Sequence, residues 1–539
     1  TFKFADSIWK HSSNYQYDTN FQVISPKNKV YTSYEQPYFI NDTTFCAIKY
    51  GLQHEKHFVI ISGKNEKKLY TPGYFNPIRL ATSGETIIFS NNKKYEELIY
   101  STNGKYITWS EVQYDKRWAH QTWSIIKKYD IDKGKIQKLT KYTKYFAPAI
   151  SPNGQLIAVS EILPEYKFSL VIIDAYKGNE IKRLSLPHNE MLITPSWSPD
   201  NKQLYCIAMD KDGNKGILKI NYDDLKYEYI LNPSHNEISR PLFDGKFIFF
   251  NGSYDGISNI YALNPENYKI YRVSSAKYGA LYPSVLTEKN KIAFSNYTNN
   301  GYQIVVVPYD TSKWSEINYE NISYLPIAET ITNQELNLIN NNNKIDTNYT
   351  IKKYSKLLHL FHFHSWMPFY YGDVNEIYPG ITLMSQNILS TAFLVLNYGY
   401  NYNEKKSVIN SSFIYKGFYP IIKIKQSYGG RKSYFSDYNT INQIEFNWNE
   451  AITSLNINIP LNLTKSKWFR SFTPYTEIQN IYITDAKHNA PFNGSLQALS
   501  VGFIYRNLLK TAERDLRPRW GQMIDFNYIS SLNANLKSK

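Results

Sequence analysis

A repeated sequence unit within the first 310 residues restricts the fold of this chain more than any other feature. Each copy has a proline, a short strand, a tight turn and a second strand. Four copies are clear: FAPAISPNGQLIAVSE (146–161), ITPSWSPDNKQLYCIA (193–208), ISRPLFDGKFIFFNG (238–252) and LYPSVLTEKNKIAFSN (281–296). Their leading prolines lie 47, 46 and 42 residues apart, at Pro148, Pro195, Pro241 and Pro283. This period is typical of four-stranded propeller blades.

Weaker copies of the unit precede these four, at residues 35–50, 75–90 and 99–111. The turns Asn103-Gly104, Asn153-Gly154 and Asp244-Gly245 are dipeptides that tolerate positive φ in a hairpin. We therefore predict an all-β protein that begins with a β-propeller of about six to seven blades over residues 1–310. The seventh blade stays open because residues 76–140 contain two turn signals only 20 residues apart.

The repeat resembles the TolB-like propellers, whose signature is a Ser-Pro-Asp-Gly turn before an apolar strand. It is more distantly similar to the propeller that precedes the catalytic domain of prolyl oligopeptidases. An enzyme of that kind needs a Gly-x-Ser-x-Gly elbow after the propeller, followed by Asp and His on an α/β sheet. The sequence has no such elbow, and the residues after the propeller do not alternate as α/β. We expect a non-enzymatic chain with no catalytic residue and no cofactor.

The sequence pattern changes after residue 310. Residues 311–350 are rich in asparagine and are predicted to be a linker. From Tyr354 onward the apolar-polar alternation runs over longer stretches, which predict strands of roughly nine residues or more. These strands are expected at residues 357–366, 391–402, 407–417, 419–429, 440–449, 454–463, 471–484, 495–507 and 522–532. Lys416-Gly417 and Asn449-Glu450 are expected to be tight turns, and residues 429–439 a long loop.

The stretch SLNINIPLNL (454–463) alternates most strictly. Nine residues from Leu455 to Leu463, tilted in a barrel, cross roughly 20 Å, which is close to the apolar band of an outer-membrane barrel. Aromatic residues cluster at the ends of such strands, as at Trp448 and Trp468. We predict an incomplete antiparallel transmembrane β-barrel over residues 351–539. The alternative is a second soluble β domain, which Pro460 favours because proline cannot donate to a closed ladder.

Several stretches resemble a group of Bacteroidota outer-membrane proteins in which a TolB-like propeller precedes a barrel similar to those of assembly and translocation factors. They are HLFHFHSWMPF, PGITLMSQNILSTA, YKGFYPIIKI, NIPLNLTKSKW, ERDLRPRWGQ, WSEVQYDKRW and YFAPAISPNG. The resemblance implies a Gram-negative outer membrane with the propeller in the periplasm. Because a barrel of that kind needs more strands to close, we expect a fragment of a longer protein.

The excess of basic over acidic residues indicates which partners the chain could attract. The chain has 61 Lys+Arg against 46 Asp+Glu, a formal net charge of +15. The positive charges are scattered, which favours an anionic neighbour such as lipopolysaccharide or phospholipid over nucleic acid. Cys46 and Cys206 occupy similar strand-like settings in different repeats, so we expect two buried free thiols.

Two segments dense in charge and aromatic residues are candidate interaction sites. In WSEVQYDKRWAH (109–120), Glu111, Asp115, Arg117 and Trp118 could line a rim that grips a peptide or glycan, or could form a long loop with a local ion pair. In ERDLRPRWGQ (513–522), the candidates are Arg514, Asp515, Arg517, Arg519 and Trp520. This segment could fold into a barrel lumen, where charges find water and partners, or contact lipopolysaccharide.

The histidines do not predict a metal site. His54 and His57 have the wrong spacing for one face of a strand, so a solvated turn is expected. His362 and His364 share a face, but no Cys or carboxylate partner follows at ligand spacing, and the same holds for His359.

Three functions remain open from the sequence. The first is a non-enzymatic outer-membrane protein that translocates or assembles surface proteins or glycans. The second is a membrane-anchored scaffold whose propeller binds a peptide, peptidoglycan or a periplasmic protein. The third is an enzyme with its catalytic domain upstream of Thr1.

Overall fold

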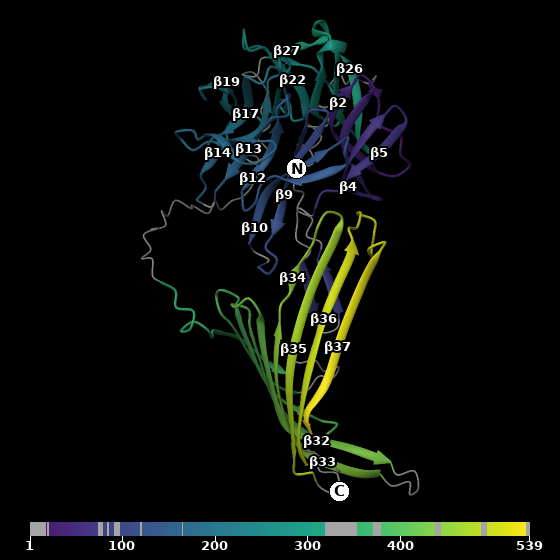
Figure 1. Ribbon diagram of the computed structural model, residues 1–539, viewed down its shortest axis with the longest axis vertical. Coiled ribbons are helices and arrows are strands. Elements are labelled where there is room, and N and C mark those ends of the chain that lie inside the picture. The colour runs from purple at the N-terminus through teal and green to yellow at the C-terminus, as the bar shows by residue number, and fades with distance from the viewer. Residues whose placement is uncertain are drawn as a thin grey trace, which may run out of the picture.

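The structure is a computed structural model (Figure 1). It describes residues 18, 21–73, 79–83, 86–90, 98–118, 121–163, 165–317, 353–369, 379–436, 443–486 and 493–534. No helix within these ranges is long and apolar enough to cross a membrane.

Six antiparallel sheets form a propeller in the first part of the chain. Blade 1 comprises β2 (Thr32–Asn41), β3 (Thr44–Gly51), β4 (His54–Ser62) and β5 (Asn65–Tyr70). Blade 2 comprises β8 (Tyr100–Thr102), β9 (Tyr106–Tyr114), β10 (Thr122–Asp130) and β11 (Lys135–Lys138). Blade 3 comprises β12 (Tyr145–Ile150), β13 (Leu156–Ile162), β14 (Phe168–Asp174) and β15 (Glu180–Leu184).

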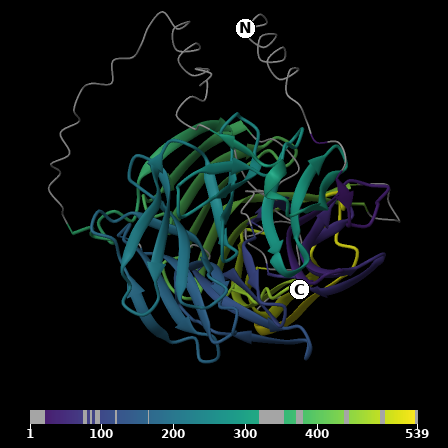
Figure 2. The same ribbon diagram turned by 90° about the horizontal axis from the view of Figure 1, so that it is seen from above.

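The remaining three blades follow the same order. Blade 4 comprises β16 (Met191–Trp197), β17 (Gln203–Met209), β18 (Lys215–Asn221) and β19 (Tyr227–Ser234). Blade 5 comprises β20 (Ile238–Phe243), β21 (Ile248–Gly252), β22 (Asn259–Leu263), β23 (Ile270–Arg272) and β27 (Ser315–Ile317). Blade 6 comprises β24 (Ala280–Leu286), β25 (Lys291–Thr298), β26 (Gly301–Pro308) and β1 (Gln22–Val23). Figure 2 shows the blades around a common centre, seen from above.

The ring closes through the N-terminal strand. β1 pairs with β26, so that Gln22 lies opposite Val306 and Val23 opposite Val305. The outermost strand of blade 6 therefore comes from the start of the propeller sequence, while its other three strands come from the end. This joins the two ends of the ring by main-chain hydrogen bonds.

Six apolar clusters hold the blades together, one at each of the six interfaces between neighbouring blades. The strands contribute to two clusters at once because successive side chains point to opposite faces. In β17, Leu204 and Cys206 pack toward blade 3, whereas Tyr205 and Ile207 pack toward blade 5. Burial on both faces explains why the blade strands are nearly continuous apolar runs.

The described residues of the weak repeat copy at 75–90 do not form a blade. They form β6 (Arg79–Ser83) and β7 (Thr86–Ser90), a separate two-stranded sheet. The described residues thus contain six blades, and the seventh that the sequence left open is not found among them. β27 lies within the predicted linker and pairs with β23, while residues 318–350 lie outside the described residues.

The second part of the chain forms one antiparallel sheet of ten strands, here called the long sheet. It comprises β28 (Phe363–Phe369), β29 (Pro379–Gln386), β30 (Ala392–Asn401), β31 (Lys406–Tyr415), β32 (Ile421–Ser436), β33 (Gln443–Asn458), β34 (Leu461–Asn462), β35 (Trp468–Thr484), β36 (Gly494–Leu509) and β37 (Gly521–Ala534). Apart from β34, which pairs with β35 alone, the strands follow one another as neighbours, with β28 and β37 at the two edges. The sheet curls into a trough (Figure 1). The described residues do not close this sheet into a barrel.

Several predicted boundaries in the long sheet are wrong. The expected turn at Asn449-Glu450 lies inside β33, a single strand of 16 residues, and most of the expected loop at 429–439 belongs to β32. The two segments pair with each other over their whole length, from Ile421–Asn458 to Ser436–Gln443. Tertiary pairing therefore overrides a local polar signal. Residues 357–360, expected in a strand, form a turn before β28.

Rows of apolar side chains cross several strands on one face of the long sheet. One row runs from Phe413 through Ile424, Leu455 and Ile478 to Leu499. A second row on the same face, four positions further along β32, runs through Tyr398, Ile409, Tyr428, Ala451 and Tyr482. The row between the two is polar and consists of Ser411, Gln426, Thr453 and Asn480.

The other face of the long sheet has polar rows, including Lys423, Asn456 and Glu477. Asn456 Nδ2 donates to Glu477 Oε2 at 3.0 Å on this face. The strict alternation in SLNINIPLNL thus separates two faces of different polarity.

Pro460 lies at a break in the ladder. β33 ends at Asn458 and β34 begins at Leu461, and both pair with β35. Ile459 N still donates to Pro474 O at 3.0 Å, so the pairing resumes around the proline. A local irregularity is where a proline within a paired sheet is expected.

Candidate functional site

The repeat prolines lie at bulges in the inner strands, around the centre of the propeller. In five of the six inner strands, the residue before a proline has positive φ: Gln36 (56°), Ala147 (44°), Thr194 (48°), Arg240 (54°) and Tyr282 (65°). The pairing register shifts at each of these positions. Proline cannot donate to the ladder, so it is accommodated by a bulge. A positive φ at a residue other than glycine costs on the order of 1–3 kcal/mol and is typical of functional positions.

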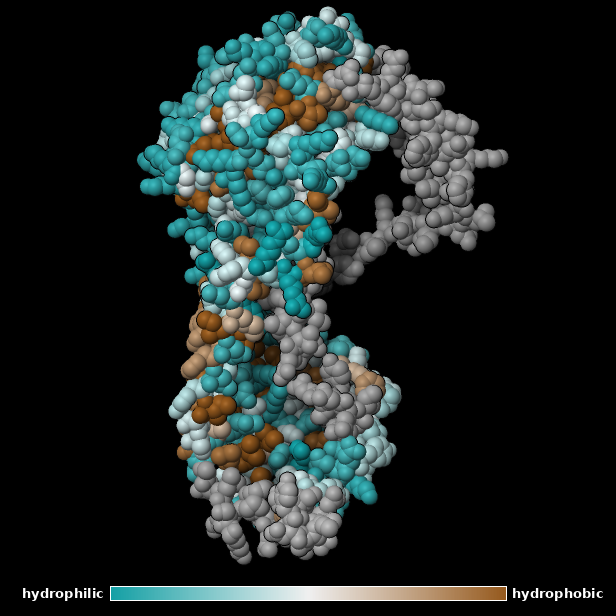
Figure 3. All heavy atoms as spheres, turned by 90° about the vertical axis from the view of Figure 1, so that its right-hand side faces the viewer, coloured by the Kyte–Doolittle hydropathy of each residue, from teal (hydrophilic) through white to brown (hydrophobic). Residues whose placement is uncertain are grey.

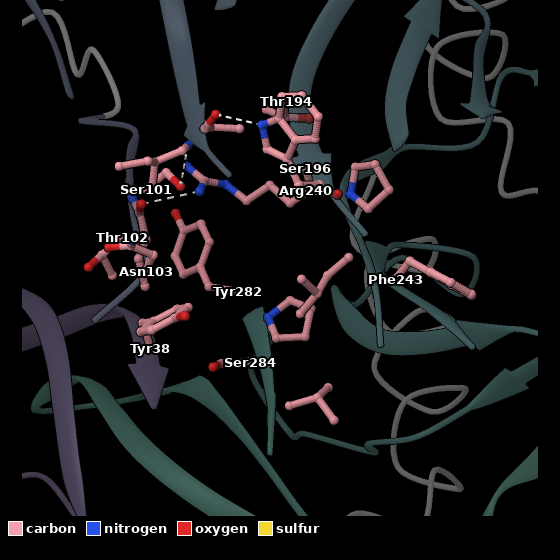
Figure 4. A pocket seen from close by; sticks show the side chains of 18 of the residues that line it. Tyr38, Ser101, Thr102, Asn103, Thr194, Ser196, Arg240, Phe243, Tyr282 and Ser284 are labelled. Atoms are coloured by element: carbon pink, nitrogen blue, oxygen red, sulfur yellow. Dashed lines mark hydrogen bonds between the residues drawn. The ribbon is translucent and has the colours of Figure 1, made fainter. Parts of the chain in front are cut away.

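The bulges surround a cavity of about 510 Å³ (Figure 4). Prolines and aromatic rings provide much of its wall, among them Pro148, Pro195, Tyr38, Tyr282 and Phe243. The volume lies within the range of small-molecule and peptide sites in proteins. The cavity is therefore the candidate binding site that the propeller itself offers.

Arg240 is the only Lys, Arg or His among the described residues that line this cavity. Its Nη1 donates to Gln36 Oε1 at 3.1 Å, and its guanidinium carbon lies 4.6 Å from the centroid of the Tyr282 ring. These contacts link the bulges of blades 5, 1 and 6. They hold the planar guanidinium in one orientation at the cavity.

Two hydroxyl groups add hydrogen-bonding capacity. Thr194 Oγ1 and Ser196 Oγ are buried and have no hydrogen-bond partner in the described part of the chain. The indole N–H of the neighbouring Trp197 does have a hydrogen-bond partner, because Nε1 donates to Ala149 O of blade 3 at 2.9 Å. Buried polar atoms without partners are rare and costly, which points to water or a ligand at these positions.

The residues singled out in WSEVQYDKRWAH lie at a different place, the contact between the propeller and the long sheet, here called the junction. Glu111 is buried on β9, pairs with Lys127, and accepts hydrogen bonds from Gly73 N (3.0 Å) and Trp109 Nε1 (3.1 Å). It is therefore an internal ion-pair partner on a strand.

The β9–β10 loop reaches the long sheet. Asp115 Oδ1 accepts hydrogen bonds from Arg117 N and Trp118 N, each at 2.8 Å, which fixes the loop. The Arg117 guanidinium stacks on Trp118 at 4.5 Å and donates to the carbonyl oxygens of Tyr419 and Phe418, the latter at 3.3 Å. Asn462 N also donates to Lys116 O at 2.7 Å.

The ERDLRPRWGQ segment meets the propeller at the same junction, through the β3–β4 turn. Arg514 N donates to Leu52 O at 2.9 Å, and Arg519 Nη2 to Gln53 O at 3.2 Å. Asp515 organises the segment because its carboxylate pairs with Arg519 Nε at 2.9 Å and accepts from Ala512 N.

Two further residues of the segment, Trp520 and Arg517, differ in their surroundings. Trp520 packs edge-on against Trp468 with ring centroids 5.1 Å apart, and Arg517 is exposed. The two segments selected from the sequence therefore contact opposite partners of one interface, as Figure 1 shows near β9, β10 and β34.

Burial perturbs titratable groups near the junction. It lowers the pKa of Lys510, in the β36–β37 connection, to about 8, while the charges of Glu111 and Glu55 act in the opposite direction. Burial also lowers the pKa of His57 to about 4. The expectation of a solvated turn at His54 and His57 is wrong, since both lie on β4 and His57 is 3% exposed.

No group of three or more metal-ligating side chains is brought together among the described residues. His359, His362 and His364 are exposed, at and just before β28. The cavity residues Arg240, Gln36, Thr194 and Ser196 were missed by the sequence analysis. Their signal was available, since Gln36, Thr194 and Arg240 each stand directly before a repeat proline.

No protein-family model matches the chain. An uncharacterised protein of Agrobacterium fabrum is 26% identical over 152 residues, which are 28% of this chain and 50% of that protein. The chain thus spans about half the length of this curated relative. TolB from Acinetobacter baumannii is 12% identical with a TM-score of 0.32, over 69% of this chain and 77% of that one. Oligogalacturonate lyase from Vibrio parahaemolyticus is 11% identical with a TM-score of 0.37, over 56% of this chain and 97% of that one. A TolB protein is therefore among the structural neighbours of the chain.

Proposed function

We propose that the chain is an outer-membrane protein of a Gram-negative cell, with the apolar face of the long sheet against lipid and the propeller in the periplasm. The observation that carries this proposal is the exposure of large apolar side chains on one face of the sheet, in three of its rows: Ile478 is 48% exposed, Tyr428 58% and Tyr528 61%. Figure 3 shows apolar patches on the surface of the long sheet in the lower half of the molecule. Soluble proteins rarely expose contiguous apolar patches larger than a few hundred Å².

The spacing of the rows supports lipid contact. Along β32, Tyr428 belongs to the row that also contains Tyr398 and Tyr482. Ile422 belongs to a row shared with Ile457 and Val501. Tyr428 lies six positions after Ile422, which is about 20 Å along the strand and about 14 Å of depth in a strand tilted by about 45°. An outer-membrane barrel has an apolar band about 25 Å tall, edged by aromatic side chains.

If the long sheet lies in a membrane, its two edge strands must be paired. Unpaired main-chain groups are very costly in hydrocarbon, so open sheet edges do not face lipid. β28 and β37 must therefore be paired in the membrane with strands other than those described here. Disulfide cross-linking of cysteines placed along β37 would identify its partner strand.

A matched pair of charge substitutions tests the membrane proposal. Ile478 lies in an apolar row, whereas Gln479 lies on the opposite face, in a row with Ser454 and Lys425. Ile478→Lys is expected to prevent stable insertion, because a lysine facing lipid costs about 2–4 kcal/mol at mid-membrane. Gln479→Lys is expected to be tolerated. Fractionation with a urea wash measures both, and a wild-type chain that stays soluble without detergent would exclude the proposal.

For the cellular role, we favour translocation or assembly of surface proteins or glycans, without catalysis by the described residues. Lipopolysaccharide and phospholipid are the expected neighbours, in line with the net charge of +15. The polar face of the trough, with Lys423, Asn456 and Glu477, supports a water-facing path. The second candidate is a membrane-anchored scaffold whose propeller binds a peptide, peptidoglycan or a periplasmic protein. It is favoured by the cavity at the propeller centre.

Planar-bilayer recording separates the two roles. Conductance by the inserted chain supports a conduit. Absence of conductance, together with capture of a defined partner by the propeller, supports the scaffold.

A further inference from the structure

We propose that the cavity at the centre of the propeller binds a ligand through a carboxylate group, which Arg240 anchors. The inference rests on the scaffold role proposed above and names the chemistry of its ligand. It concerns the propeller alone and holds whether or not the long sheet enters a membrane, so the two proposals fail separately.

Residues of three blades hold the Arg240 side chain in place for binding a carboxylate. The bulge before Pro241 carries it on β20, Gln36 on β2 accepts its Nη1 hydrogen bond at 3.1 Å, and Tyr282 on β24 stacks against it at 4.6 Å. Figure 4 shows Arg240 and Tyr282 directed into the cavity. A planar guanidinium held in one orientation matches the two oxygens of a carboxylate.

Other polar groups of the cavity restrict the rest of the ligand. The unpartnered hydroxyls of Thr194 and Ser196, on the adjacent blade 4, provide hydrogen-bond donors and acceptors. Asp244 and Glu288 belong to turns that also line the cavity. Two carboxylates there repel a polyanion. The ligand that fits has one carboxylate and an otherwise neutral body that packs on prolines and aromatic rings.

The cavity is reached from the end of the propeller opposite the junction. It is lined by residues of the β8–β9 and β20–β21 turns, including Asn103 and Asp244. The junction uses the β3–β4 and β9–β10 connections. Successive turns of an antiparallel blade lie at opposite strand ends, so the long sheet does not cover the cavity.

The carboxylate could belong to the C-terminus of an extended peptide or to a small organic acid. The purified full chain in detergent is titrated calorimetrically with N-acetylated tetrapeptides that have free C-termini, with the same peptides as amides, and with sodium glucuronate. Tighter binding of the free-acid peptides by about tenfold or more over the amides indicates a peptide source. Binding of glucuronate alone indicates a small acid. Failure of every carboxylate probe to bind overturns the proposal.

Variants test the anchor. Arg240→Gln is expected to weaken carboxylate binding about tenfold or more. Arg240→Lys is expected to restore only part of the lost affinity, because an ammonium group cannot donate two parallel hydrogen bonds to a carboxylate as a guanidinium does. The matched control is Arg272→Gln, on outer strand β23 of the same blade, where Arg272 pairs with Asp255 at 2.7 Å. Its binding should be unchanged.

A second variant covers the case in which Arg240→Gln does not fold, as judged by circular dichroism. Thr194→Val removes one hydroxyl with little change in volume and should weaken binding several-fold. Carboxylate binding that is unaffected in folded Arg240→Gln, or in Thr194→Val where the arginine variant is unfolded, overturns the proposal.

Discussion

The guanidinium of Arg117 in the propeller donates a hydrogen bond to the main-chain carbonyl oxygen of Phe418 in the long sheet, at 3.3 Å. It also donates to the neighbouring carbonyl of Tyr419. A single side chain thus fastens the β9–β10 loop to the connection between β31 and β32. The propeller and the long sheet are therefore joined by specific contacts as well as by the chain between them.

Arg117→Ala is expected to loosen this junction. Hydrogen bonds to a charged group contribute about 1.5–3 kcal/mol, so local opening should become roughly ten- to a hundredfold more frequent. The amide of Asn462 reports it, because Asn462 N donates across the junction to Lys116 O at 2.7 Å. Hydrogen exchange read out at this residue should accelerate in Arg117→Ala and stay unchanged in Arg272→Ala. Equal protection in both variants would show that Arg117 does not hold the junction.

His57 is expected to make the propeller acid-sensitive. Burial lowers its folded pKa to about 4, against about 6.5 in the unfolded chain. The unfolded state binds more protons between these values, so stability is full above about pH 6.5 and falls as the pH drops toward 4. The loss is on the order of 3 kcal/mol. Denaturant unfolding between pH 4 and 7 should show a shallower decline in His57→Gln. The control is His188→Gln, at an exposed position; if His57→Gln declines as steeply as this control, burial of His57 is not the cause.

Lys182 is expected to lock two blades together. From β15 it donates to Tyr222 O (2.8 Å) and Asp223 O (2.7 Å) of blade 4, and it lies 4.4 Å from the Tyr222 ring centroid. Lys182→Met should lower the free energy of unfolding by about 1–3 kcal/mol, since it removes both bonds but keeps an apolar stem. Thermal unfolding measures this against Lys177→Met, at an exposed position of the same blade. Similar midpoints for the two variants would contradict the interlock.

The two cysteines are expected to be unreactive in the folded chain. Burial raises the pKa of both Cys46 and Cys206 to about 12, so almost no thiolate forms at neutral pH. A maleimide should label neither thiol in the native protein and both in denaturant, as mass spectrometry would show. Labelling of either one under native conditions would mean that the blade interfaces open readily.

The sequence predicted the blades well because the repeat encodes them locally. A proline, a turn dipeptide and two apolar runs recur, and the structure places Pro148, Pro195, Pro241 and Pro283 at equivalent bulges. The positive φ before each proline was not predictable, because it depends on the register with the next strand. The weak copy at residues 75–90 has the local pattern, but its described residues form the pair β6–β7 and not a blade.

The junction could not be predicted because its parts are distant in sequence. Arg117 and Tyr419 are separated by 302 positions, and nothing local links them. Charge density singled out residues that make contacts across the junction, but it could not identify their partners. In the long sheet, Asn449-Glu450 resembled a turn because two polar residues stood together. Glu450 instead lies within a strand, opposite Gly429 and Ile483.

The most direct test of the central claim compares the two faces of β33 at adjacent residues. Leu455 belongs to an apolar row, and Asn456 to the polar face, where it bonds to Glu477. Leu455→Cys and Asn456→Cys are spin-labelled in the full chain, reconstituted in phospholipid vesicles, and their collision rates with oxygen and with a water-soluble nickel chelate are measured. The account predicts that the label at position 455 collides preferentially with oxygen, which partitions into lipid, and the label at 456 with the chelate. Equal access of the chelate to both labels would contradict it.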